Sequence, residues 1–195
     1  MVRNAISIRS ATREDAPDLV ELWSESLRRA DRSEQIADLE LVIKQAAASP
    51  DQRLIVVECN GAFAGAVLLR LLTLSPVNLE PCVQSIQPRV LARFGRQGVG
   101  RAMMEAAASF AEENGVLVMS TSVPASDRDA NRFMARLGFN SAYVWRVAPT
   151  AVVRSRLDPA PSQRRSNVSR SRVMAARRSA RRRTTEPVEL DGLAD

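Results

Sequence analysis

The stretch FGRQGVGRAMMEAAASFAEENG, residues 94–115, places glycines and arginines at the start of a long alanine-rich helical run. Backbone N–H groups are unpaired at any helix start, and the helix dipole adds partial positive charge there. The glycines let several of these N–H groups point at one spot, and the arginines add formal charge. This local chemistry predicts an anion site about as well as it predicts a plain turn into a helix.

The segments on either side of this stretch predict a mixed α/β domain. Asn60-Gly61 is a strong two-residue hairpin signal between two apolar runs. Pro88 lies inside a further strand, and because proline cannot donate to a neighbouring strand, we expect a bulge or an edge position there. The hydrophobic periodicity predicts the order β-α-α-β-β-β-α-β-α-β, with strands at 5–12, 53–59, 63–74, 83–91, 116–123 and 141–149, a loop at 76–82, and helices at 12–30, 33–48, from the glycine turn to 113, and at 127–139.

Charge is distributed very unevenly along the 195 residues. Residues 1–149 carry 17 basic and 17 acidic side chains, whereas residues 150–185 carry 11 arginines and one acid. The last ten residues carry four acids and no base. The basic segment has almost no large apolar side chain and cannot form a packed core. We therefore predict a folded domain at 1–150 and an arginine-rich, disordered tail at 151–195.

Several classes of chemistry are disfavoured by composition. The chain has no histidine, which removes Ser-His-Asp hydrolysis and the HExxH zinc pattern. Its two cysteines make a disulfide framework or a structural zinc site improbable, so we expect no metal. The glycine spacing is not GxxxxGK[ST], so a nucleotide-hydrolysing P-loop is not expected. We find no signal-peptide pattern and no apolar run long enough for a membrane helix, and we expect a cytoplasmic protein.

Three motifs in register resemble the GNAT (Gcn5-related N-acetyltransferase) family. The run RQGVGRAMMEAAASFAEENG is similar to the acetyl-CoA-binding motif of that family, which reads approximately Arg/Gln-x-x-Gly-x-Gly/Ala. The run IRSATREDAPDLVELW resembles the usual opening strand and helix, and NRFMARLGF resembles the late motif. The resemblance covers residues 5 to about 149 and implies the GNAT fold, with splayed central strands.

The resemblance also implies a coenzyme site and a reaction. In the family, the pyrophosphate of coenzyme A binds amides at the helix start, and the splayed strand pairs with pantetheine. The reaction implied is direct attack of a neutral amine on acetyl-CoA, which serves as co-substrate. The coenzyme-binding residues implied here are Val90, Leu91, Arg96, Gln97, Gly98, Val99, Gly100, Arg101 and Asp127.

The sequence departs from the family pattern at four places. Gly95 stands where the family has an Arg or Gln side chain, and Asp127 falls at the opening Asn of the late motif. The tyrosine that often protonates the leaving thiolate is replaced by Met134, which cannot donate a proton. The central strand also lacks the usual glutamate base. Glu80 and Tyr143, the only tyrosine, are the candidates for acid–base roles, against ordinary surface or packing roles.

Three hypotheses for function follow. The first is an acetyl-CoA-dependent N-acetyltransferase acting on an unknown primary amine. The second is a GNAT-like protein that binds acyl-CoA without turnover, because Met134 replaces the usual acid. The third is a nucleic-acid-associated protein in which the arginine-rich tail neutralises phosphates. An anionic membrane surface is another partner for the tail, a solvated tail without a partner is the alternative, and a homodimer is left open.

Overall fold

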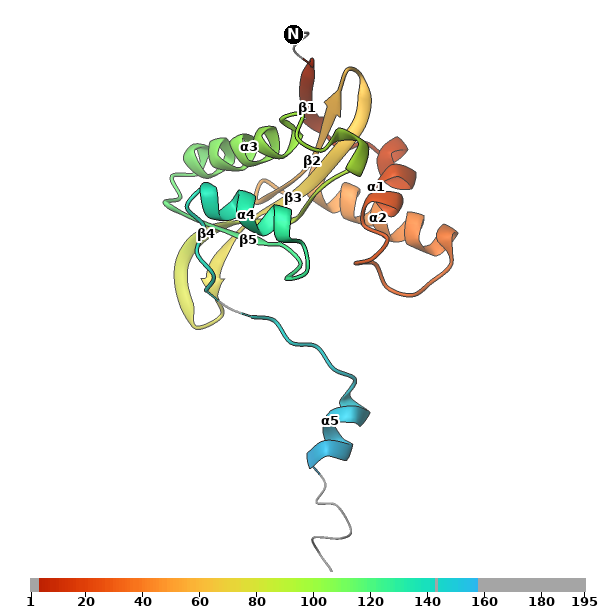
Figure 1. Ribbon diagram of the computed structural model, residues 1–195, viewed down its shortest axis with the longest axis vertical. Coiled ribbons are helices and arrows are strands. Elements are labelled where there is room, and N and C mark those ends of the chain that lie inside the picture. Colours follow the sequence, from red (N-terminus) through yellow and green to blue (C-terminus); the bar gives the residue numbers. More distant parts are fainter. Residues whose placement is uncertain (1–3, 143, 158–195) are drawn as a thin grey trace, which may run out of the picture. The chain divides into compact units, whose positions relative to one another are not determined.

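The computed structural model describes residues 4–142 and 144–157. The chain divides into two compact units, one up to Ser141 and one from Ala142 onward. The first unit contains a five-stranded sheet and the helices that cover it (Figure 1). Its strands are β1 (Ile6–Ser10), β2 (Gln52–Cys59), β3 (Ala62–Ser75), β4 (Asn78–Val90) and β5 (Val118–Ser122).

The strands lie in the order β1-β2-β3-β4-β5, and all neighbours are antiparallel except β4 and β5, which are parallel. The β2–β3 hairpin turns at Asn60-Gly61, where both residues have positive φ (52° and 76°), as a tight primed turn requires. The predicted hairpin is therefore confirmed. The last connection, from β4 to β5, is a parallel crossover through α3 (Val99–Glu113).

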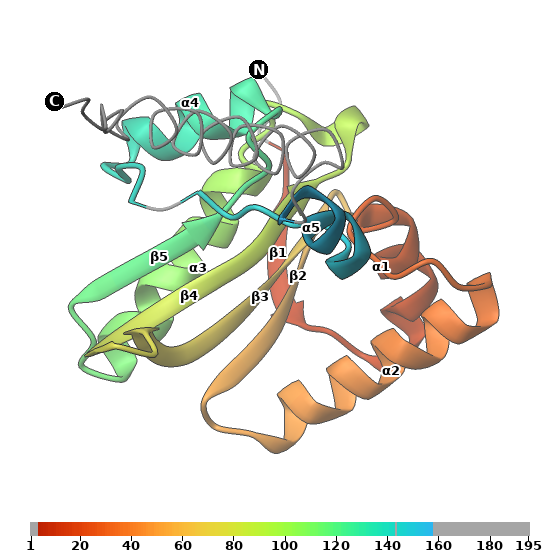
Figure 2. The same cartoon turned by 90° about the horizontal axis from the view of Figure 1, so that it is seen from below.

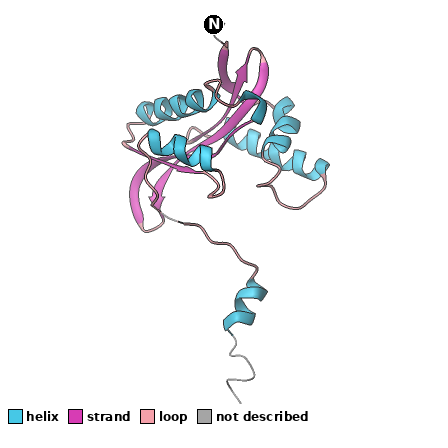
Figure 3. Cartoon of the chain, in the orientation of Figure 1, coloured by secondary structure: helices cyan, strands magenta, loops and turns pink. Residues whose placement is uncertain are grey.

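Helices cover both faces of the sheet (Figures 2 and 3). One face packs against α1 (Ala16–Leu22) and α2 (Arg32–Ala48) in a core centred on Leu19, Trp23 and Val56. The other face packs against α3 and α4 (Arg128–Arg136), in a core that includes Phe110, Met103 and Met134. Two short 3-10 turns, η1 (Arg13–Asp15) and η2 (Ala92–Phe94), lead into α1 and toward α3.

Pro88 lies at a bulge, as predicted. The register between β3 and β4 shifts between Leu68–Ile86 and Ala66–Arg89, so β4 has one residue more than β3 across this step. Gln87, directly before the proline, has a φ of 50°. The missing N–H of proline is tolerated because the ladder is already interrupted there.

Three predicted elements differ from the structure. Residues 78–82 belong to β4 instead of a loop, because β3 and β4 form one long hairpin that turns at 76–77. The first helix ends at Leu22, well short of residue 30. Residues 141–149 form no strand in the part that the structure describes, and the side chains of Val144, Trp145 and Val147 are exposed. A strand needs a hydrogen-bonding neighbour, and the described residues provide none for this segment.

The second unit contains α5 (Thr150–Leu157) among its described residues. The predicted domain boundary at 150 stays a prediction, and the predicted disordered tail lies almost wholly outside the described residues. None of the helices in the described ranges has the length and apolar content to span a bilayer.

Candidate active site

The turn before α3 presents a run of backbone amides without acceptors. Ala102 N–H donates to Gly98 O at 3.0 Å, which is the first hydrogen bond of the helix. Among the described residues, no acceptor is found for the six preceding N–H groups, those of Arg96, Gln97, Gly98, Val99, Gly100 and Arg101. The structure thus brings together all six residues that the sequence predicted for the pyrophosphate, as one stretch of polypeptide.

The glycine at the helix start is required by its backbone conformation. Gly98 is the N-cap of α3 and has a φ of 93°, in the left-handed region. A Cβ added there would also lie 3.0 Å from Ile6 Cδ1. Gly100 is different, because a Cβ added there would lie 3.7 Å from Phe133, an ordinary contact. Gly95 has a negative φ of −57°, so it is not needed for a left-handed turn.

Gln97 holds the turn in place through its side chain. Its Oε1 accepts hydrogen bonds from Asn4 Nδ2 at 2.8 Å and from Cys59 Sγ at 3.4 Å. Its Nε2 donates to Arg93 O at 2.9 Å. These bonds connect the turn to the ends of β1 and β2. The Gln97 side chain is therefore structural, and only its backbone N–H is available to a ligand.

The two central strands separate next to this turn. Pairing between β4 and β5 runs from Cys82–Val118 to Ile86–Ser122, while β4 continues to Val90 on its β3 side. Along the described chain, no strand pairs with β4 beyond Ile86 on the β5 side. This is the predicted splay. It leaves a strip of β4 backbone open between the bulge and the amide turn.

The open strip offers the backbone of Val90 but not the amide of Leu91. Leu91 N–H donates to Ala64 O at 2.9 Å, and Leu91 O accepts from Phe94 N–H at 2.8 Å. Because N–H and C=O groups alternate in direction along an antiparallel pair, those of Val90 face away from β3, toward the opened side. Of the two residues predicted to pair with pantetheine, the structure leaves Val90 available.

The bulge is fixed from the other face of the sheet. The indole Nε1 of Trp23, a residue that is 6% exposed, donates to Gln87 O at 2.9 Å. Ser26 Oγ donates to Gln87 Oε1 at 3.3 Å. The end of α1 therefore holds the unusual backbone conformation of Gln87 in place.

Arg89, one residue past Pro88, lies between two acidic side chains. Its Nη2 is 3.6 Å from Glu25 Oε2, in the connection between α1 and α2, and its Nη1 is 3.7 Å from Asp127 Oδ2. Its Nε is buried and has no hydrogen-bond partner among the described residues. The side chain is 21% exposed. Arg89 is not among the site residues predicted from the sequence, although Pro88, which predicts the bulge, directly precedes it.

Asp127 caps α4. Its Oδ1 accepts from Ala130 N–H at 2.9 Å, which satisfies one amide of the first turn. Its other oxygen faces Arg89. The sequence placed Asp127 among coenzyme-binding residues, and that role stays a prediction. The structure shows a carboxylate at the start of α4 whose Oδ2 takes no part in capping the helix.

Of the two predicted acid–base residues, only Glu80 lies in the described part of the chain, and it is far from the bulge. Glu80 is in β4, seven residues before Gln87, which places it about 23 Å away along the strand. Tyr143 lies outside the described residues. Met134, at the position of the usual tyrosine, is 6% exposed and belongs to the core beneath α4.

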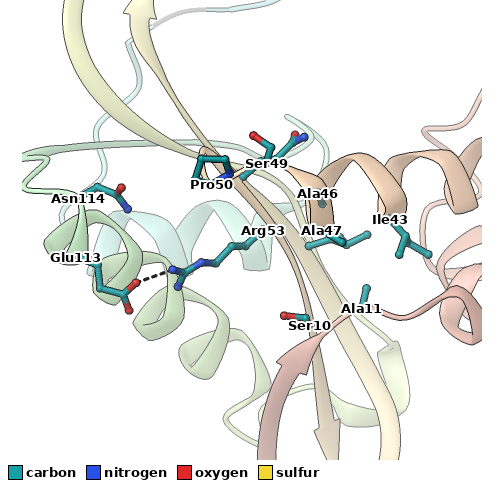
Figure 4. Close-up of a pocket in the computed structure, with 12 residues that line it drawn as sticks. Ser10, Ala11, Ile43, Ala46, Ala47, Ser49, Pro50, Arg53, Glu113 and Asn114 are labelled. Carbon is teal, nitrogen blue, oxygen red and sulfur yellow. Dashed lines mark ion pairs between the residues drawn. The ribbon is translucent and has the colours of Figure 1, made fainter.

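A separate hollow of about 420 Å³ lies at the far end of α3, near Ser10, Ser49 and Pro50 (Figure 4). Its arginine is already satisfied, because Arg53 Nη2 pairs with Glu113 Oε2 at 2.7 Å. The 15 residues of α3 put this hollow about 21 Å from the amide turn. It is not part of the candidate site.

A family model described as the acetyltransferase (GNAT) family matches residues 16–139. The chain belongs to the GNAT acetyltransferase family. The match spans the splay, the amide turn and α4, and it confirms both the predicted family and the predicted enzyme class, an N-acetyltransferase. No match was found among curated proteins.

Solved structures of known proteins share this GNAT fold. A transcriptional regulator from Bacillus halodurans C-125 is 18% identical, with a TM-score of 0.62 over 74% of this chain and 99% of that chain. The aminoglycoside N-acetyltransferase AAC(6')-Iy, solved with CoA, is 13% identical, with a TM-score of 0.61 over 75% and 95%. Glucosamine-6-phosphate N-acetyltransferase from Arabidopsis thaliana is 14% identical, with a TM-score of 0.58 over 75% and 99%. The predicted fold class is confirmed.

Within residues 4–142 and 144–157 of this GNAT chain, no group of three acidic or cysteine side chains is arranged to hold a metal ion. Both cysteines are buried and unpaired with each other. The groups that the described site offers for chemistry are therefore backbone amides, the Arg89 guanidinium and nearby carboxylates.

Proposed function

We propose that this GNAT chain transfers an acetyl group from acetyl-CoA to a primary amine. The observation that supports this most strongly is the run of six acceptor-free amides beside the opened β4–β5 pair. A helix start with free amides attracts an anion, and an open strand edge attracts an extended amide-containing chain. Coenzyme A carries both groups in one molecule, a pyrophosphate followed by pantetheine.

In this proposal the pyrophosphate binds the amides from Arg96 to Arg101. Hydrogen bonds from N–H groups to phosphate oxygens are charge-assisted and stronger than neutral ones. The side chains of Arg96 and Arg101 add positive charge at the rim of the turn. Pantetheine then follows β4 toward the bulge and pairs with the backbone of Val90, which directs the thioester to the region of Gln87 and Arg89.

The reaction is a direct transfer. The nitrogen of a neutral amine attacks the thioester carbonyl carbon, the C–S bond breaks, and coenzyme A leaves as a thiolate. The nitrogen releases one proton and the thiolate takes up one, so that an amide and a free thiol are formed. The chain contributes mainly position, and holding the two reactants in line supplies a large part of the rate enhancement.

The coenzyme step is tested with acetyl-CoA and the truncated thioester S-acetylpantetheine, which lacks the pyrophosphate. We expect acetyl-CoA to raise the Tm of the full chain, because a ligand that binds only the folded state must stabilise it. Gly98→Val should weaken acetyl-CoA binding strongly and leave the weak binding of S-acetylpantetheine unchanged. An equal loss for both ligands would contradict the assignment of the pyrophosphate to this turn.

Transfer is tested by release of free thiol from acetyl-CoA in the presence of an amine panel. Thiol release that depends on an amine, together with an acetylated product of the right mass, supports the enzyme. A thermal shift without any thiol release would instead support a non-catalytic acyl-CoA-binding protein. The burial of Met134 at the usual acid position is the observation that favours this second candidate.

The third hypothesis concerns the arginine-rich tail, which lies almost wholly outside the described residues. It stays a prediction. Retention of the full chain on RNA that is lost at high salt, and lost on truncation after residue 150, would support it.

A further inference from the structure

The Arg89 side chain is 21% exposed, and its guanidinium makes no hydrogen bond to any described residue. Its two contacts, to Glu25 and Asp127, are ion pairs of 3.6 and 3.7 Å, both longer than a hydrogen bond. Nε has no partner and is shielded from solvent. A buried polar atom without a hydrogen bond is unfavourable, and both Nη groups contact their carboxylates only at ion-pair distance, so the guanidinium can accept a hydrogen-bonded carboxylate from a ligand.

Arg89 is placed for a substrate other than the coenzyme. Successive side chains of a strand point to opposite faces. Val90 packs against the core beneath α3, on the side of the amide turn, whereas Ala66, the cross-strand partner of Arg89, belongs to the core beneath α1 and α2. The Arg89 side chain therefore lies on the α1–α2 side, next to the bulge, where an acceptor can meet the thioester from the face opposite the coenzyme.

The charges around Arg89 suit a molecule that carries both signs. One guanidinium lies between two carboxylates, Glu25 and Asp127, which come from different elements and approach different nitrogens. Glu25 is 85% exposed and can be displaced at little cost. Asp127 has one oxygen that is not used by its cap. An incoming carboxylate can take both Nη groups at once, and the ammonium group of the same molecule can approach Asp127.

We propose that the acceptor is an amine that also carries a carboxylate, as an amino acid does, and that Arg89 binds this carboxylate. The proposal rests on the acetyltransferase function proposed above. The planar guanidinium offers two parallel N–H groups that match a carboxylate, and such bidentate pairs are among the strongest hydrogen-bonded contacts in proteins. Arg89 sets acceptor specificity, and Asp127 attracts the amine before it loses its proton.

The test compares each standard amino acid with its α-amide, in which the carboxylate is replaced by a neutral group of the same shape. Acetyl transfer by the full chain is followed through thiol release. We expect kcat/KM to be about 30-fold higher for the best amino acid than for its amide, as loss of a charged hydrogen-bonded pair predicts. In Arg89→Gln this ratio should fall to about one, whereas the Kd for acetyl-CoA stays within about twofold of the unchanged protein.

Two further variants separate specificity from folding. Arg89→Lys keeps the charge but not the planar pair, and should recover only part of the ratio. Arg70→Gln removes an exposed arginine of β3 that lies on the same face of the sheet, and should leave the ratio unchanged. The ratio is measured within one variant, so a change in stability alone does not move it.

The outcomes distinguish this inference from the proposed function. If acetyl-CoA gives no thermal shift, the proposed function itself fails. If acetyl-CoA binds and amines without a carboxylate react as well as amino acids, only the role of Arg89 is overturned. The same conclusion follows if phosphorylated amines are preferred, if no amino acid reacts or binds, or if Arg89→Gln keeps the preference for the carboxylate.

Discussion

The starts of α2 and α3 differ in what is placed near the unpaired backbone N–H groups of the first helical turn. At α2, Asp31 is the N-cap, and its Oδ1 accepts from Glu34 N–H at 2.8 Å and from Ser33 Oγ at 2.7 Å. At α3, the N-cap is Gly98, which has no side chain to accept anything, and six consecutive amides are left without described acceptors. The cap of α2 therefore supplies a carboxylate at the helix start, whereas the start of α3 supplies none and leaves its amides open to an anion.

The 3-10 turn η1, which leads into α1, also uses an acidic side chain. Asp15 Oδ2 accepts from Thr12 N–H at 2.7 Å, and the same carboxylate receives both Nη groups of Arg9 at 2.7 Å. Asp15 is 5% exposed, so its charge is held inside the protein by these bonds. This comparison teaches that a helix start without an acid is the place to look for an anionic ligand.

The largest effect is expected at the uncapped start. Gly98→Val should lower acetyl-CoA affinity by about 100-fold, because a β-branched residue cannot hold the left-handed turn that aligns the amides. The matched control is Gly138→Val, since Gly138 has the same φ of 93° after α4 and open space around it. Isothermal titration should show that both variants lose stability but only Gly98→Val loses affinity. Equal affinities would remove the distinction between the two kinds of helix start.

The second effect concerns Asp15, the buried acid of η1. Burial by itself would raise the pKa of Asp15, but hydrogen bonds from Arg9 and from the Thr12 backbone outweigh it and lower that pKa below its ordinary value. The stability that the ionised carboxylate contributes is therefore present at neutral pH, and it is lost as the pH falls through the folded-state pKa.

Arg9→Gln should lower the free energy of unfolding by about 1–2 kcal/mol at neutral pH, a discounted value because Arg9 is partly exposed. Urea unfolding at a series of pH values should show a weaker acid dependence in the variant. Its acetyl-CoA affinity should match that of the unchanged chain. An Arg9→Gln chain with the original acid dependence would show that Asp15 is not held by Arg9.

A third, smaller effect tests charge at the rim of the uncapped turn. Arg96→Gln and Arg101→Gln should each weaken acetyl-CoA binding about threefold to tenfold at low ionic strength, and less at high salt, since exposed charges are screened. Titrations at two salt concentrations give the result. A loss that does not depend on salt would point to a direct, desolvated contact instead.

The smallest effect is expected at the capped start. Asp31→Ala removes the acceptor for Glu34 N–H and should lower the Tm by only a few degrees, because water can replace an exposed cap. Coenzyme affinity and thiol release should not change. A loss of acetyl-CoA affinity in Asp31→Ala would show that stability of the helices, and not the amide turn, limits binding.

Much of the fold could be predicted from the sequence because its signals are local. The Asn60-Gly61 hairpin, the bulge at Pro88 and the glycine turn each depend on residues adjacent in the chain. The segment at 141–149 could not be predicted in this way, because alternating apolar residues specify a strand only if a neighbour is present. Residues 78–82 were missed because the hairpin with β3 extends farther than their polar and proline content indicates.

In the candidate site, too, the features that depend on neighbouring residues could be predicted, and those that depend on distant residues could not. The amide turn was predictable, since backbone conformation and residue type are set within a few positions. The structural use of the Gln97 side chain was not, because its partners Asn4 and Cys59 are distant in sequence. Neither was Arg89, whose surroundings are made by residues from the α1–α2 connection and from the start of α4. Glu80 was selected for its nearness in sequence, but an extended strand carries it away from the bulge.

The sequence by itself determined the family, the order of the main elements and the stretch of amides that suits a pyrophosphate. Each depends on a pattern of residues that lie close together in the sequence. Only the tertiary structure placed the predicted splay of β4 and β5 after Ile86, and only it showed that Trp23 fixes the bulge and that one guanidinium meets two carboxylates. These features depend on how separate elements pack, and packing brings together residues that no local pattern connects.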